Sequence, residues 1–133
     1  MATNIPGRRV SYSETFYTDW SARGGDCALL RAQVLVKSSS TGKILVSMET
    51  RSEEETGTNL MDTAFPSSAP RVLVMEAVEV KTAIYTAVSG ASTPLRGFKG
   101  LWRIKITFSG GAPGDYYVLR LFSPVFFDNS VPA

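Results

Sequence analysis

The sequence predicts an all-β protein, a single antiparallel β-sandwich of about eight strands. Three observations predict this class. Apolar and polar residues alternate with a period of two in several segments, clusters of turn residues separate these segments, and no segment has a convincing helical pattern. The short spacing of the segments favours a jelly roll, with a small barrel as the nearest alternative.

Length and composition indicate one domain. The chain has 133 residues, of which 44% are hydrophobic and 20% are charged, as in ordinary globular proteins. We expect a single domain over residues 1–133, with extended arms at about 1–8 and 124–133, because both ends are rich in Pro, Asn and Ser. The arms carry apolar residues that need cover, either from the domain itself or from a neighbouring subunit. These residues are Ile5, Val125, Phe126 and Phe127.

Three strands are predicted in the first half of the chain. The segment RRVSYSETF predicts a weak strand, whose larger side chains are Val10, Tyr12 and Phe16. Residues 29–37 and 44–49 predict two stronger strands, and the turn sequence SSSTGK between them predicts a hairpin. One face of the first strand contains Leu30, Ala32, Val34 and Val36, and one face of the second contains Ile44, Val46 and Met48.

Residues 72–88 have the strongest strand pattern, because nearly all of their even-numbered positions are β-branched. The helix formers in VMEAVEVKTA leave a helix as the alternative. The run exceeds the usual length of a strand, so we expect a bend or bulge near Lys81 to divide it. Residues 59–65 predict a short edge strand, and the prolines of PSSAP disfavour regular pairing after it.

A two-stranded ribbon is predicted from residue 100 to residue 123, because two alternating segments flank the turn sequence SGGAPGD. Burial selects a register that pairs Ile104 with Leu119 or Leu121, since a slip by one residue would mix apolar and polar faces. The inward rows are then Trp102, Ile104, Ile106 and Phe108 on the first strand, and Tyr117, Leu119 and Leu121 on the second. The outward row, the candidate contact surface, contains Arg103, Lys105, Tyr116 and Arg120.

Composition excludes several classes of site. The chain has no histidine and one cysteine, which removes Ser-His-Asp triads, Cys-His dyads and zinc sites built from His and Cys. Cys27 lies beside an apolar run, where we expect a buried and inert thiol. The net charge of +2 gives no strong field for nucleic acid or an anionic membrane. We therefore expect no enzymatic activity, no cofactor, no membrane partner and no nucleic acid partner.

Two loops were weighed as ligand sites. The cluster of Glu49 with Glu53, Glu54 and Glu55 offers the oxygen ligands that calcium prefers. Its spacing matches no defined calcium loop, so a solvated turn is the favoured interpretation. The sequence SGGAPGD lacks the Gly-Lys-Ser/Thr ending of a phosphate loop and is interpreted as a turn.

Two stretches of the chain resemble known modules. The sequences GKILVSMETRSEEETGTNL and LWRIKITFSGGAPGDYYVLRLFS are similar to parts of small β-sandwich and jelly-roll modules that build phage particles and similar assemblies. In such modules a strand ending in Glu-Thr enters a polar loop, and an Arg-Ile-Lys-Ile strand leads through a glycine turn into the closing strand. The resemblance implies a fold and an assembly role, and it transfers no functional residues.

The leading functional hypothesis is a non-enzymatic structural protein that packs against copies of itself and other particle proteins, in a shell, decoration or filament. A carbohydrate-binding module is the first alternative. Its stacking platforms would be Trp20, Trp102, Tyr116 and Tyr117. A single-stranded nucleic acid binder is the second alternative, and its phosphate contacts would be Arg103, Lys105 and Arg120.

The start of the chain bears on location. The segment MATNIPGRRVSYSETF contains no apolar stretch long enough for a secretory signal. We expect a protein made in the cytoplasm without a signal peptide. If the assembly hypothesis holds, its final location is a virion or another assembled particle.

Overall fold

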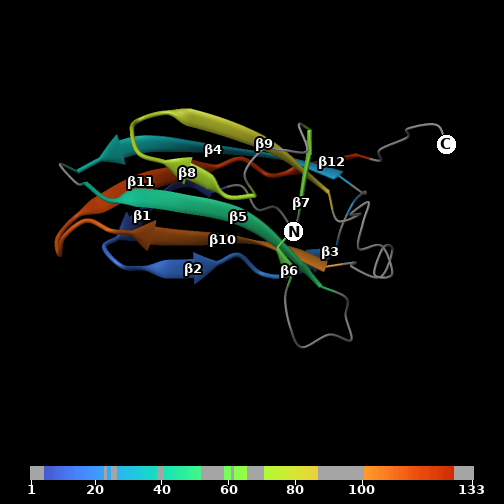
Figure 1. Ribbon diagram of the computed structural model, residues 1–133, viewed down its shortest axis with the longest axis horizontal. Coiled ribbons are helices and arrows are strands. Elements are labelled where there is room, and N and C mark those ends of the chain that lie inside the picture. Colours follow the sequence, from blue (N-terminus) through green and yellow to red (C-terminus); the bar gives the residue numbers. More distant parts are fainter. Residues whose placement is uncertain are drawn as a thin grey trace.

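The computed structural model describes residues 5–22, 24, 27–38, 41–51, 59–60, 62–65, 71–86 and 101–127. These residues form two antiparallel sheets that pack against each other, as Figure 1 shows. All regular secondary structure among these residues consists of β-strands, so the predicted all-β class is confirmed. The two-layer arrangement is that of a β-sandwich.

Each sheet has six strands. Sheet A contains, in order, β1 (Ile5–Ser11), β11 (Tyr116–Leu121), β4 (Cys27–Lys37), β9 (Val80–Thr86) and β7 (Asp62–Phe65), with β12 (Val125–Phe127) also paired to β4. Sheet B contains, in order, β2 (Thr15–Tyr17), β10 (Leu101–Ser109), β5 (Lys43–Arg51) and β6 (Asn59–Leu60), with β3 (Ser21–Ala22) paired to β10 and β8 (Leu73–Met75) paired to β5.

The described residues contain more strands than the sequence predicts. Short strands share a single long neighbour: β2 and β3 both pair with β10, β6 and β8 both pair with β5, and β11 and β12 both pair with β4. A strand of two or three residues is too short to show an alternating pattern, so the sequence analysis does not detect it.

The core lies between the two sheets, and alternation predicts its rows correctly. In β10 the even-numbered side chains are buried and the odd-numbered ones are half-buried. In β11 the odd-numbered side chains are buried. The buried row of β10 consists of Trp102, Ile104, Ile106 and Phe108, and that of β11 consists of Tyr117, Leu119 and Leu121. Both rows join one hydrophobic cluster.

The two predicted hairpins are wrong. β4 and β5 belong to different sheets, and so do β10 and β11, so each predicted turn instead carries the chain from one sheet to the other. Ile104 pairs with Met48 of β5, and Leu119 pairs with Val34 of β4. The physical reason is that burial fixes which face of a strand points inward but not which strand lies beside it. A crossing between sheets buries the same apolar rows as a hairpin does.

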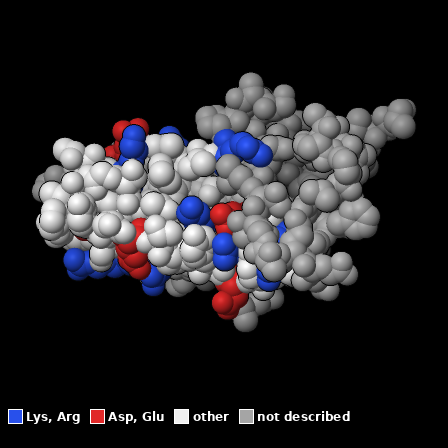
Figure 2. All heavy atoms as spheres, turned by 60° about the horizontal axis from the view of Figure 1, so that its bottom comes forward, with Lys and Arg blue, Asp and Glu red and all other residues white. Residues whose placement is uncertain are grey.

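Charges of both signs are mixed on the surface. Figure 2 turns the bottom of Figure 1 forward, where β2 and β10 lie, and shows basic and acidic side chains as neighbours. Ion pairs among the described residues follow this pattern. The guanidinium of Arg8 lies 2.6 Å from Glu14, and that of Arg103 lies 2.8 Å from Glu49. This side of the molecule therefore lacks the single-sign field that steers polyanions over long distances.

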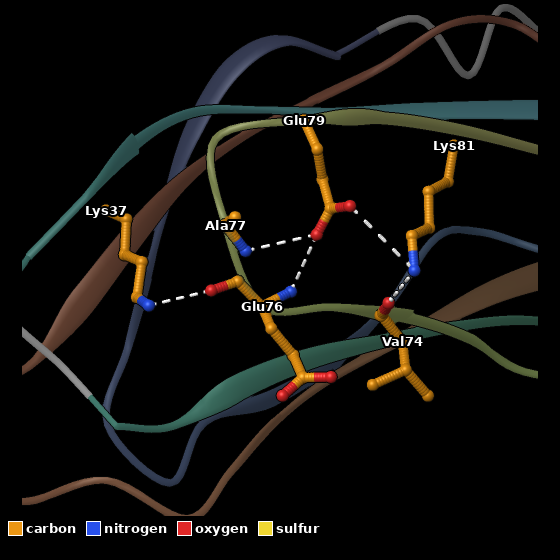
Figure 3. Close-up of polar contacts among 6 residues, drawn as sticks. All are labelled: Lys37, Val74, Glu76, Ala77, Glu79 and Lys81. Atoms are coloured by element: carbon orange, nitrogen blue, oxygen red, sulfur yellow. Dashed lines mark hydrogen bonds and ion pairs between the residues drawn. The ribbon is translucent and has the colours of Figure 1, made fainter.

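A polar turn divides the run of residues 72–88, as its length predicts. The break lies at residues 76–79 rather than near Lys81, and Figure 3 shows its contacts. One carboxylate oxygen of Glu79 accepts hydrogen bonds from the backbone N–H groups of Glu76, at 2.9 Å, and Ala77, at 3.1 Å. Lys81 donates to the carbonyl of Val74 at 2.7 Å, and Lys37 donates to the carbonyl of Glu76 at 2.7 Å. These bonds hold the crossing from β8 to β9 in one conformation.

The buried residues around this turn are not those of the even-numbered β-branched row. The even-numbered Val78 and Val80 are 64% and 43% exposed, whereas the odd-numbered Leu73, Met75 and Tyr85 are buried. The alternation therefore identifies the segment as strand, while the β-branched residues lie on its outer side.

We predict that Glu79→Ala lowers the free energy of unfolding by about 1.5 kcal/mol, because two backbone N–H groups lose a charged acceptor. Chemical denaturation of dilute protein, followed by circular dichroism, measures the change. Glu76→Ala is the matched control, since its carboxylate makes no contact in Figure 3 and its loss should change stability by less than about 0.5 kcal/mol. Equal effects of the two substitutions would contradict the role given to Glu79.

Two buried tyrosines make the stability of the fold depend on pH in the alkaline range. Burial raises the pKa of the Tyr85 phenol well above its ordinary value. Burial also raises the pKa of Tyr117, and the charges of Glu76, Glu79 and Asp115 raise it further. Tyr117 donates a hydrogen bond of 2.6 Å to the carbonyl of Gly42, whereas the buried hydroxyl of Tyr85 has no hydrogen-bond partner among the described residues.

We predict that stability is lost as pH rises above about 10, the ordinary pKa of tyrosine. In that range the unfolded chain loses phenol protons that the folded chain retains, so the free energy of unfolding falls with pH. Denaturation curves on both sides of this pH measure the loss. Tyr85→Phe should reduce the slope and leave stability at neutral pH unchanged or raised by about 1 kcal/mol, because no hydrogen bond is removed. If the free energy of unfolding of Tyr85→Phe fell with pH as steeply as that of the natural chain, the pH dependence could not be assigned to Tyr85.

Candidate functional site

The four residues of the predicted outward row do not form one surface. Arg103 and Lys105 alternate with the buried residues of β10 and lie on the outer face of sheet B. Tyr116 and Arg120 alternate with the buried residues of β11 and lie on the outer face of sheet A. Because the core separates the two faces, a single ligand or partner surface cannot contact all four side chains at once. For the same reason, Arg103, Lys105 and Arg120 cannot together contact the phosphates of one nucleic acid strand on a single face.

On sheet B, Arg103 is held in a stack of aromatic rings. Its guanidinium lies 3.9 Å from the ring centroid of Tyr17 and 4.5 Å from that of Trp20. Its Nε donates to Glu49, at 2.8 Å, and the Glu49 side chain is only 12% exposed. Arg51 stacks on Trp20 as well, at 4.8 Å. These contacts satisfy Arg103 within the chain, so we interpret this cluster as structural.

The predicted sugar platforms are mostly unavailable. Trp102 and Tyr117 belong to the core, where they are 4% and 0% exposed. Trp20 carries two stacked arginines, and Arg9 stacks on Tyr116 at 4.1 Å. A sugar needs an open ring face to stack on. The structure therefore disfavours the carbohydrate hypothesis in the form that the sequence suggested.

The apolar residues of the predicted arms lie in strands of their own domain. Ile5 opens β1, pairs with Leu121 and packs against the core. Phe126 lies in β12, pairs with Ala28 of β4 and packs against Trp102 with ring centroids 5.2 Å apart. Ile5 and Phe126 are therefore covered by their own domain, one of the two alternatives for these residues, and the arms stay a prediction. Val125 and Phe127 pair with β4 as well, and Val125 remains 59% exposed. Residues 1–4 and 128–133 lie outside the described residues.

The outer face of sheet A combines apolar and basic residues. On the four adjacent strands β1, β11, β4 and β9, alternation and pairing place the arginines Arg9, Arg31 and Arg120 on this face. None of the three forms an ion pair with a described carboxylate. The outward positions of these four strands include no acidic residue. The face is therefore basic although the whole chain is close to neutral.

An apolar patch lies on the same face. It consists of Leu35, Val36, Val80 and Val118. A β-bulge creates part of it, because Val118 pairs with Val36 and Leu119 pairs with Val34, which leaves Leu35 as an extra residue. Leu35 and Val36 are consequently both exposed, at 38% and 44%.

Gly7 leaves this patch open toward β1. A Cβ at Gly7 would lie 3.7 Å from Leu35 Cδ1 and 3.9 Å from Val118 Cγ1, so these two side chains flank a position without a side chain. The bulge and the glycine together expose more apolar surface than a regular strand pair would. Contiguous exposed apolar surface of this kind often marks an interaction site.

A basic side chain borders the patch. Arg9 pairs with Val118 on the β1 side. Glu76, in the turn that Lys37 contacts, does not border the patch, because its carboxylate points toward β5 of sheet B (Figure 3). The patch is therefore apolar, with a basic border toward β1.

The structure also bears on the cysteine, the glutamate cluster and the possibility of a metal site. Cys27 is buried, as expected. Glu49 is nearly buried beside Arg103, whereas Glu53 to Glu55 lie outside the described residues, so the calcium alternative stays a prediction. Within the described ranges, no three His, Cys, Asp or Glu side chains are grouped to hold a metal ion. No helix in that part of the chain is long and apolar enough to cross a membrane.

Sequence reasoning missed the apolar patch and the role of Arg9. The alternation in residues 29–37 assigns Val36 to the inner face, and only the bulge reverses this. A bulge leaves no composition signal here, because Leu35 is an ordinary strand residue. The one available signal was Gly7, a glycine inside a strand, which often accompanies a close approach or an irregular pairing.

Comparisons with known proteins add no identification. The chain matches no protein family model, no curated protein and no solved structure.

Proposed function

We propose that this protein is a non-enzymatic structural subunit that associates with copies of itself through the outer face of sheet A. Such a subunit would build a particle, for example a virion-like shell, a decoration or a filament, together with other particle proteins. The single observation that carries the proposal is the exposed apolar patch of Leu35, Val36, Val80 and Val118. A monomer would leave this patch in water, where exposed apolar surface favours association.

We also propose that the fold is a jelly roll. The order β1-β11-β4-β9 in one sheet and β2-β10-β5-β8 in the other, with the chain alternating between sheets, is the wiring of this fold. The short strands β3, β6, β7 and β12 are then additions to an eight-stranded frame. Jelly rolls occur in capsid subunits and in lectins, so the fold is compatible with assembly but does not prove it.

A second copy is the partner that we propose for the patch. In a two-fold contact the same patch meets itself, so the apolar side chains of one copy cover those of the other. This arrangement gives apolar contact at the centre and leaves polar and basic side chains at the rim, as in ordinary protein interfaces.

Sedimentation velocity over a concentration series tests the proposal. We expect the natural chain to shift from monomer to a larger species as concentration rises. Leu35→Lys should abolish the shift, because it places a charge in the centre of the patch. Val125→Lys is the matched control, since Val125 is more exposed than Leu35 and lies outside the patch.

The natural chain itself decides whether copies associate. A natural chain that remains monomeric at its highest soluble concentration would refute self-association. A Leu35→Lys variant that associates as strongly as the natural chain would refute the role given to the patch.

A further inference from the structure

We infer that Arg31, Arg120 and Phe122 form a binding site for a phosphate group with two negative charges. The site lies on the outer face of sheet A beside the apolar patch, and none of its three residues belongs to the patch. The inference does not rest on the proposed self-association. Its residues come from two neighbouring strands and the segment that follows β11. Three observations about these side chains lead to the inference.

The first observation is that two guanidiniums share one aromatic ring. The guanidinium carbon of Arg120 lies 4.3 Å from the ring centroid of Phe122, and that of Arg31 lies 4.7 Å from it. The backbone N–H of Phe122 donates to the carbonyl of Arg31 at 3.1 Å, which fixes the ring beside β4. Both guanidiniums therefore stack on one and the same ring, which limits the motion of both side chains.

The second observation is that these cations have no anionic partner. Neither Arg31 nor Arg120 forms an ion pair or a side-chain hydrogen bond with a described residue. The Nε of Arg120 is buried and has no hydrogen-bond partner. Two like charges beside one ring repel each other, and buried unpaired donors cost free energy. A bound anion would relieve both penalties.

The third observation is that the described residues around the two guanidiniums are polar and not acidic. Gln33 pairs with Arg120, and Thr82 pairs with Arg31, so an amide and a hydroxyl lie beside the two guanidiniums on three adjacent strands. Both groups can donate hydrogen bonds to an oxyanion. The outward positions of β1, β11, β4 and β9 include no Asp or Glu that would compete.

The chemistry of the pair selects a phosphate dianion over other anions. One guanidinium fork is sufficient for a carboxylate, which has two oxygens and a single charge. A phosphate monoester or inorganic phosphate has three or more oxygens and close to two negative charges at neutral pH, so it can accept from both guanidiniums. A phosphodiester has one charge and two free oxygens, and it matches the pair less well.

Nuclear magnetic resonance of the full chain tests the site. Inorganic phosphate is added to ¹⁵N-labelled protein at constant ionic strength, and the amide signals of Arg31, Gln33, Arg120 and Phe122 are followed. We expect these signals to shift with saturation while distant signals stay in place. Affinity should fall as the pH is lowered from the alkaline side through neutrality, because the inorganic phosphate dianion takes up a proton there.

Variants separate the site from general charge effects. Arg31→Gln and Arg120→Gln should each abolish saturation, and Arg120→Lys should weaken binding about fivefold, because lysine keeps the charge but loses the fork. Lys105→Gln removes the same charge from the opposite sheet and should leave binding unchanged. Saturation that survives both glutamine substitutions would overturn the inference, and so would shifts that never saturate.

A ligand series tests the chemical class. Dimethyl phosphate and acetate, each a monoanion, should bind at least about tenfold more weakly than inorganic phosphate. Equal binding of all three anions would overturn the selection for a dianion. A single-stranded oligonucleotide that binds when inorganic phosphate does not would replace this inference with a polymer-binding surface.

Discussion

Trp102→Ala should lower the free energy of unfolding by about 4 kcal/mol, the largest single loss we expect in this chain. The Trp102 side chain is 4% exposed, and its ring lies 5.2 Å from that of Phe126. Its indole N–H donates to the carbonyl of Ala22 at 2.9 Å. Truncation therefore creates a cavity between the two sheets and leaves that carbonyl without its donor. Urea denaturation measures the loss.

The other tryptophan provides the control. Trp20 is only half-buried, and its contacts with Arg51 and Arg103 are stacking interactions near the surface. Trp20→Ala should cost about 1 kcal/mol. Trp102→Phe should fall between the two, because it keeps most of the apolar volume but loses the indole donor. A Trp102→Ala variant as stable as Trp20→Ala would mean that Trp102 is not in the core.

Gly42→Ala should lower the free energy of unfolding by about 2 to 3 kcal/mol, although it adds only one methyl group. A Cβ at this position would lie 2.5 Å from Phe108 Cε1 and 3.1 Å from the carbonyl oxygen of Ser109. The Phe108 ring cannot move away easily, because it packs edge-on against Tyr117 with centroids 5.5 Å apart. The carbonyl of Gly42 also accepts the buried Tyr117 hydroxyl, so any shift of the backbone strains that bond.

Gly7→Ala is the control for this substitution. Its Cβ would meet nothing closer than 3.7 Å, so the methyl group fits without displacement. We expect a change within about 0.5 kcal/mol, since alanine is also better suited to a strand than glycine. Denaturation midpoints of the two variants, compared with the natural chain, give the result. A Gly42→Ala variant that is as stable as Gly7→Ala would show that the ring of Phe108 yields at little cost.

Strand faces could be predicted from the sequence, and strand partners could not. The alternation of Trp102, Arg103, Ile104 and Lys105 fixes which side chains point inward, and the structure agrees. The partner of β10 depends on contacts with β5, which lies far away along the chain. A turn sequence such as SGGAPGD permits both a hairpin and a crossing between sheets, because positive φ values at Gly110, Gly111 and Gly114 serve either path.

The candidate surfaces were less predictable than the core for a related reason. Arg103 and Arg120 are outward in both the predicted ribbon and the structure, but the crossing places them on opposite faces. The bulge at Leu35 depends on the pairing of β4 with β11, which the sequence alone does not specify. The composition around Phe126 does not specify what covers its ring, because proline and asparagine nearby resemble a tail while the ring packs against the core.

The alternation of the chain between sheets has a consequence for how the protein reaches its folded state. Among the strand pairs of the described residues, β5 and β6 are the only sequence neighbours that pair with each other. Early events cannot then rely on hairpins that close quickly between adjacent segments. The chain must bring distant segments together and pay their loop-closure entropy before most of the sheet contacts form. We therefore expect refolding in the range of about milliseconds to seconds, typical of sandwiches with non-local pairing.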